Sequence, residues 1–62
     1  MNNTHEFQSI ELAIASARRA RDTSGANTRF FHGEDGAWII TRCRRTAKML
    51  RDSGYEQARV VY

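Results

Sequence analysis

The chain has 62 residues, with ten Lys and Arg, seven Asp and Glu, and one cysteine. At this length it forms one small domain, because a second hydrophobic core would have too little side-chain surface to bury. The hydrophobic share of 40% is ordinary for a globular protein and excludes a disordered chain. Eight of the hydrophobic residues are alanines, so we expect a core built on few large side chains.

Disulfides, metals and catalytic motifs are not expected in this domain. Cys43 has no partner cysteine within the chain, and His5, His32 and Cys43 lack the paired spacing of metal ligands. The sequence contains no phosphate-binding glycine loop and no common hydrolase motif, and a chain this short rarely encloses a substrate pocket. We therefore expect a protein that is not an enzyme and that needs no metal or cofactor.

The N-terminal residues and the short apolar runs indicate where in the cell the protein is located. Residues 1–6 have neither the basic nor the apolar region of a signal peptide. No uninterrupted apolar run is longer than Ala37–Ile40, which is far too short to cross a membrane. With a single free thiol in addition, we expect a cytoplasmic protein without a membrane partner, whose residues 1–6 form a flexible tail.

A first helix is predicted from Ser9 to Asp22. Ser9 is a preferred N-cap residue, and Gly25 can adopt the left-handed conformation that ends a helix. The helix carries an apolar stripe with the spacing expected for one buried face. The stripe consists of Ile10, Ala13, Ile14, Ala17 and Ala20.

A β-hairpin is predicted next, with strands over residues 28–32 and 37–41 and a turn between them. A two-residue turn would place Arg29 opposite Arg42, and two like charges facing each other are unfavourable. We therefore expect a four-residue loop, which pairs Phe31 with Trp38.

This pairing decides which side chains share a face of the sheet, because side chains alternate along a strand. It places Phe31, Trp38 and Ile40 toward the helices. The opposite face is then apolar as well, and it forms either an interface or a surface covered by the N-terminal segment or by sheet twist. The predicted interface residues are Phe30, His32, Ile39 and Val61.

An alternative use of the same face is the binding of nucleic-acid bases. Phe30 and His32 could stack on bases with Arg29 nearby, although no RNP-like motif accompanies them.

A second helix is predicted over residues 42–53, with Thr41 as its cap and Gly54 at its end. Residues 58–62 then form a third strand. The predicted fold class is α+β, a two-layer α-β-β-α-β domain with both helices packed on one face of a small three-stranded sheet.

The positive charge belongs to the second half of the chain. Residues 1–36 carry a net charge of −1 and residues 37–62 a net charge of +4. On a helix, Arg44, Lys48 and Arg51 line one edge, and such an edge can follow phosphate groups. The alternative is a solvated face that keeps the protein soluble. The predicted anion-binding residues are Arg42, Arg44, Arg45, Lys48 and Arg51.

Two functions are compatible with these features. The first is a small non-enzymatic binding protein whose arginine-rich helix contacts nucleic acid or a host nucleoprotein complex. The second is an inhibitor of the kind carried by phages and plasmids, which the chain resembles in size; like an anti-CRISPR or anti-restriction protein, it would dock on a host protein through its sheet face. In either case the shortage of core favours a homodimer or docking on a larger protein.

Overall fold

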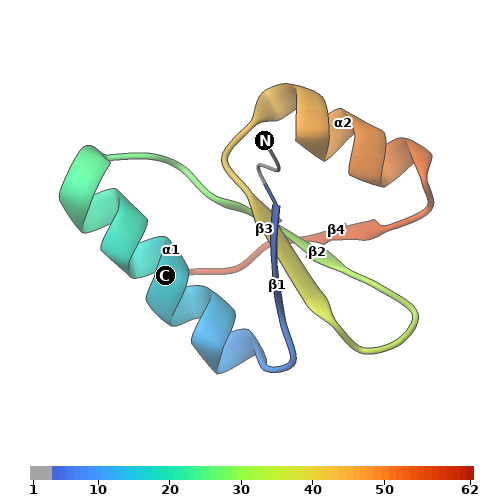
Figure 1. The fold of residues 1–62 in the computed structure, drawn as a ribbon, viewed down its shortest axis with the longest axis horizontal. Helices are drawn as coiled ribbons and strands as arrows, with labels where there is room; N and C mark the ends of the chain where they lie inside the picture. Colours follow the sequence, from blue (N-terminus) through green and yellow to red (C-terminus); the bar gives the residue numbers. More distant parts are fainter. Residues whose placement is uncertain (1–3) are drawn as a thin grey trace.

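The computed structural model describes residues 4–62, which form a four-stranded antiparallel sheet with one helix on each face (Figure 1). The elements in chain order are β1 (Thr4–Phe7), α1 (Ile10–Ser24), β2 (Arg29–His32), β3 (Trp38–Thr41), α2 (Arg44–Asp52) and β4 (Glu56–Ala58). The strand order across the sheet is β1-β3-β2-β4. The predicted α+β class is confirmed, whereas the prediction of three strands is wrong.

The additional strand is β1, at one edge of the sheet. It pairs antiparallel with β3, with Thr4 opposite Thr41 and Phe7 opposite Trp38. The expectation of a flexible tail is therefore wrong for residues 4–6, and residues 1–3 lie outside the described part of the chain. The strand is hard to recognise locally because Phe7 is its only large apolar residue, and this residue packs against the core on the α1 side.

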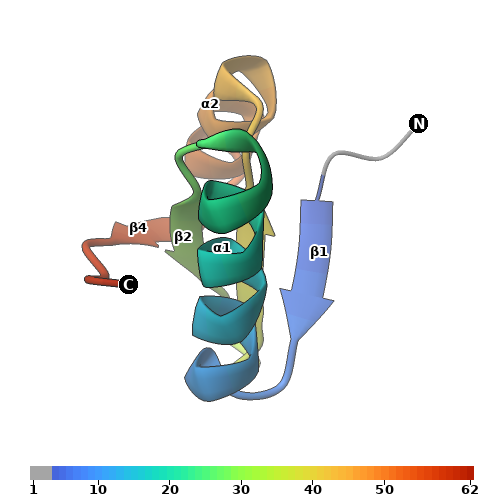
Figure 2. The same cartoon turned by 90° about the vertical axis from the view of Figure 1, so that its left-hand side faces the viewer.

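The two helices lie on opposite faces because of the order of the strands. α1 connects β1 to β2 with β3 between them, and α2 connects β3 to β4 with β2 between them. Both connections advance in the same direction across the sheet, but β1 and β3 run antiparallel to each other. Right-handed crossovers, which are nearly universal, then require helices on opposite faces. Figure 2 shows α1 in front of the strands and α2 behind them, so the two-layer prediction is wrong.

The β2–β3 register differs by one residue from the predicted pairing. Phe30 lies opposite Ile40 and Phe31 opposite Ile39, so that five residues connect the strands. A shift of one residue turns a strand's side chains to the other face of the sheet. Phe30 thus shares the α1 side with Ile40, and Phe31 shares the α2 side with Ile39.

The geometry of the connecting loop explains this register. The Gly33 N–H donates to the carbonyl oxygen of Ala37 (3.1 Å), and the Asp35 carboxylate accepts the N–H of Ala37 (3.1 Å). Gly36 adopts a left-handed conformation, with φ at 84°, that other residues rarely adopt. The loop is therefore closed by the hydrogen bond between Gly33 and Ala37, whereas the predicted four-residue loop would pair residue 32 with residue 37.

Each face of the sheet carries its own hydrophobic core. The α1-face core consists of buried Ala13, Ala17, Phe30 and Ile40, with Phe7, Ile14, Trp38, Val60 and Tyr62 half-buried against it. The α2-face core consists of buried Phe31, Ile39 and Ala47, with Leu50 and Tyr55 half-buried against it. The exposed apolar sheet face predicted from the sequence is not formed, because α2 covers it.

The helix ends follow local signals, with one exception. Ser9 caps α1 by accepting the N–H of Leu12 (3.4 Å), and Gly25 ends α1 with φ at 71°, as predicted. α2 also ends as predicted, before the left-handed Gly54. Its start differs, because Thr41 belongs to β3 and its hydroxyl accepts the N–H of Cys43 (3.1 Å), which takes the N-cap position instead.

The C-terminal strand begins and ends earlier in the chain than predicted, because the prediction placed it at residues 58–62. β4 covers residues 56–58, and residues 59–62 leave the sheet and run beside α1 (Figure 1). We call residues 59–62 the C-terminal segment.

Tyr62 attaches the C-terminal segment to the rest of the protein. Its ring lies 5.6 Å from the ring of Phe30, and its hydroxyl accepts the N–H of Thr28 (2.8 Å). The guanidinium of Arg21 on α1 lies 5.2 Å from the centre of the Tyr62 ring and also donates to the carbonyl oxygen of Tyr62. The C-terminal segment therefore completes the α1-face core.

Candidate anion-binding site

Four cationic side chains project from the outer side of α2. Arg44, Arg45, Lys48 and Arg51 are all exposed and line one shallow depression. Ala47 and Leu50, on the other side of the helix, pack into the α2-face core. We call these four cations the basic face; their alignment on one side of the helix agrees with the spacing in the sequence.

The basic face has no acidic partner among the described residues. Within residues 4–62, no carboxylate lies within 4.0 Å of the nitrogen atoms of these four side chains. Arg51 donates a hydrogen bond to the side-chain oxygen of Gln57 on β4 (3.3 Å), which leaves its charge uncompensated. Arg44 and Lys48, four residues apart on the helix, repel each other, and an anion bound between them would relieve this repulsion.

Arg42, the fifth predicted anion-binding residue, lies apart from the basic face. It precedes α2, is half-buried, and donates from Nη2 to the carbonyl oxygen of Ser16 on α1 (3.4 Å). Its Nε is buried without a hydrogen-bond partner. Arg42 therefore contacts the α1 side of the molecule, and the structure does not bring it together with the other four cations.

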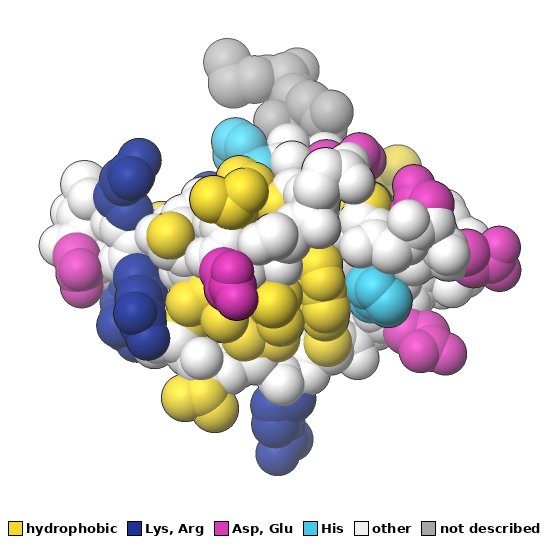
Figure 3. Space-filling view, turned by 90° about the horizontal axis from the view of Figure 1, so that it is seen from below, with side chains coloured by type: hydrophobic (Ala, Val, Ile, Leu, Met, Phe, Trp, Pro, Cys, Tyr) yellow, Lys and Arg dark blue, Asp and Glu magenta, His cyan; other side chains and the backbone are white. Residues whose placement is uncertain are grey.

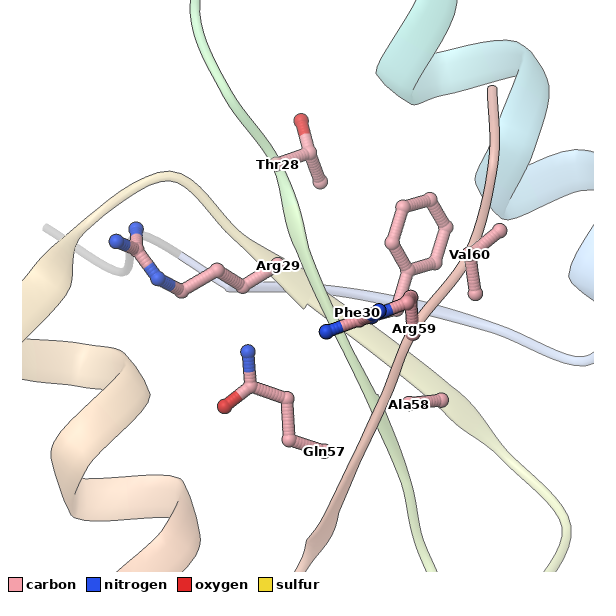
Figure 4. Close-up of a pocket in the computed structure, with 7 residues that line it drawn as sticks. All are labelled: Thr28, Arg29, Phe30, Gln57, Ala58, Arg59 and Val60. Atoms are coloured by element: carbon pink, nitrogen blue, oxygen red, sulfur yellow. The ribbon is translucent and has the colours of Figure 1, made fainter.

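A second group of cations lies at the β4 edge of the sheet. Residues 28–30 and 57–60 line a hollow there, which we call the β4-edge hollow (Figure 4). Figure 4 shows Arg29 and Gln57 extending toward α2, and Arg59 reaching across the hollow from the C-terminal segment. Neither lining stretch contains an acidic residue.

Arg29 and Arg59 were not predicted as part of an anion site. They are 30 positions apart in the chain, and only the pairing of β2 with β4 brings them to one hollow. The sequence could have indicated that these two arginines lie close together only if β4 had been correctly placed at residues 56–58.

The predicted interface residues do not form one surface. Phe30 and Ile39, 1% and 8% exposed, are buried in cores on opposite faces of the sheet. His32 is exposed and stacks on Trp38, with 4.6 Å between the ring centres. Val61 is 90% exposed on the C-terminal segment. The proposed stacking of bases on Phe30 and His32 lacks its platform, because Phe30 is buried and Arg29 extends toward the other face.

Exposed apolar surface is found on the α1 side instead. Figure 3 shows hydrophobic side chains gathered between basic groups at the α1 end and a histidine with acidic groups at the β2–β3 turn end. Half-buried side chains of the α1-face core, Ile14 and Trp38 among them, border the solvent on this side. We call this area the α1-side apolar patch.

Cys43 occupies the N-terminus of α2. The polar side chain of Thr46, and then the backbone N–H groups of Thr46 and Arg45, lower the pKa of its thiol below the ordinary cysteine value. Among residues 4–62, no three His, Cys, Asp or Glu side chains are grouped so that they could hold a metal ion. Neither α1 nor α2 is long and apolar enough to cross a membrane.

Comparison with models of known protein families, with curated proteins and with solved structures finds no match to this chain. The functional assignment therefore depends on the geometry and charge of the site.

Proposed function

We propose that the protein binds nucleic acid by placing the basic face of α2 against the phosphate backbone. The observation that carries this proposal is the set of four exposed cations on one face of a short helix, with no carboxylate of residues 4–62 in ion-pairing distance. Three of the four are arginines, whose planar guanidinium groups can bind phosphate oxygens in pairs. A nucleic-acid partner also suits the cytoplasmic location expected from the sequence.

The binding mode is independent of base sequence. Contacts to phosphates position a protein but do not distinguish bases, and the aromatic rings are buried, packed against the α2-face core, or on the α1 side. Four neutralised phosphates predict a steep salt dependence, with affinity falling on the order of 100-fold when the salt concentration is raised fourfold.

The test compares two double variants with the same change of charge. Arg44→Glu with Lys48→Glu reverses two cations of the basic face, whereas Arg18→Glu with Arg19→Glu reverses two exposed cations on α1. Fluorescence anisotropy with labelled single-stranded and duplex oligonucleotides should show that the first variant loses binding and that the second retains most of it. Circular dichroism checks that both variants fold. Equal binding by the two variants would show that the basic face has no specific role.

The second proposal is the inhibitor that docks on a host protein. The observation that favours it is the α1-side apolar patch, which replaces the sheet face considered from the sequence. Apolar docking responds weakly to salt, in contrast to phosphate binding. Capture from a host lysate that withstands both nuclease and moderate salt, and that is lost when Trp38 is changed to Glu in a folded variant, would favour this function over nucleic-acid binding.

A further inference from the structure

Arg29 and Arg59 come to the same hollow from two different parts of the chain. In the β2–β4 pair Phe30 lies opposite Ala58, the last residue of β4, and Arg29 and Arg59 are the next residues along the two chains, where the C-terminal segment leaves the sheet. Both residues line the β4-edge hollow. Within residues 4–62, neither arginine has a carboxylate within 4.0 Å. An anion in the hollow that both residues line would be attracted by two cations that have no acidic partner among residues 4–62.

The β4-edge hollow is continuous with the basic face. Arg51 of the basic face donates to the side-chain oxygen of Gln57, and Gln57 lines the hollow. Figure 4 shows the amide nitrogen of Gln57 on the side toward Arg29, where it can donate to an anion. The hydrogen bond between Arg51 and Gln57 thus joins the two groups of cations at the C-terminal end of α2.

We propose that the β4-edge hollow is a second phosphate site, in which Arg29, Gln57 and Arg59 hold a phosphate of the nucleic acid that binds the basic face. The backbone of one nucleic-acid strand then runs along α2 and continues across the β4 edge. This inference rests on the proposed function, and it raises the number of cations that contact the backbone from four to six. A phosphate is the ligand we infer because the hollow continues a surface that meets a phosphodiester chain.

The experiment measures how the binding of a single-stranded oligonucleotide depends on salt concentration. The oligonucleotide has about 20 nucleotides, which is longer than common single-strand binding sites. Arg59→Gln removes one exposed cation of the hollow, and the matched control Arg19→Gln removes one exposed cation of α1. The slope of log affinity against log salt is negative, and for single strands each lost phosphate contact reduces its magnitude by about 0.7. We expect this decrease for Arg59→Gln and an unchanged slope for Arg19→Gln.

The outcomes separate this inference from the proposed function. If the wild-type protein binds no oligonucleotide, the proposed function fails, and the second phosphate site fails with it. If the wild type binds, Arg44→Gln with Lys48→Gln lowers the magnitude of the slope, and Arg59→Gln does not, the basic face is confirmed and the second site is overturned.

Discussion

The two faces of the sheet each receive two buried side chains from the β2–β3 hairpin but have very different covers. Phe30 and Ile40 face α1, and Phe31 and Ile39 face α2. The α1 side is covered by a 15-residue helix, by Phe7 of β1 and by the C-terminal segment. The α2 side is covered by a nine-residue helix with a single fully buried residue, Ala47.

This difference indicates a division of roles between the two helices. α1 and the C-terminal segment contribute aromatic and aliphatic packing, which a small domain needs because its net stability is only a few kcal/mol. α2 covers the other side with few residues and presents four cations to the solvent. The following substitutions test whether stability and binding are separated in this way, in order of decreasing expected effect.

The largest effect is expected for Ile39→Lys, which places a charge beneath α2. Ile39 is buried in the α2-face core, and an unpaired buried charge costs more than about 4 kcal/mol, close to the whole stability of a domain this small. We expect circular dichroism to show an unfolded protein. Val61→Lys, at a fully solvated position of the C-terminal segment, should remain folded. A folded Ile39→Lys protein would mean that the cover formed by α2 is dispensable.

An intermediate effect is expected for Tyr62, which completes the α1-face core. Tyr62→Ala removes the ring contacts with Phe30 and Arg21 and the acceptor for the Thr28 N–H, so we expect a loss of about 2 kcal/mol in the free energy of unfolding. Tyr62→Phe keeps the ring and should cost about 1 kcal/mol. Urea denaturation measures both, with Val61→Ala as a control within about 0.5 kcal/mol of the wild type. Equal stability of all three variants would contradict the structural role of the C-terminal segment.

The smallest change in stability is expected for Arg44→Gln. Whether this variant is more or less stable than the wild type shows whether Arg44 serves binding or packing. Arg44 and Lys48 are like charges four residues apart on a helix, a pairing that destabilises by about 0.2–0.5 kcal/mol. Without nucleic acid, the variant should therefore unfold at slightly higher urea concentration than the wild type, while its affinity for an oligonucleotide falls. A loss of stability instead would show that Arg44 contributes to packing, and the division of roles would not hold.

Comparison of sequence and structure separates local from non-local information. The caps at Ser9 and Gly25 and the end of α2 at Gly54 were predictable, because each depends on the backbone preference of one residue next to a helix. The basic face was predictable for the same kind of reason, since the spacing of Arg44, Lys48 and Arg51 decides their alignment once the segment is helical.

The features that could not be predicted depend on pairing between strands that are distant in the chain. The strand β1 is stabilised by pairing with β3, and its sequence alone does not indicate a strand. If β1 is not recognised, α1 does not connect two parallel strands, and the handedness rule for crossovers cannot be used to assign each helix to a face of the sheet. A difference of one residue in the β2–β3 loop exchanges the faces of Phe30 and Phe31, although both pairings satisfy local strand preferences. The β4-edge hollow depends on the same information, because Arg29 and Arg59 become neighbours only when β2 and β4 pair. Local residue preferences thus predict the helices and their charge, whereas the sheet, whose hydrogen bonds join residues far apart in the chain, decides which side chains meet.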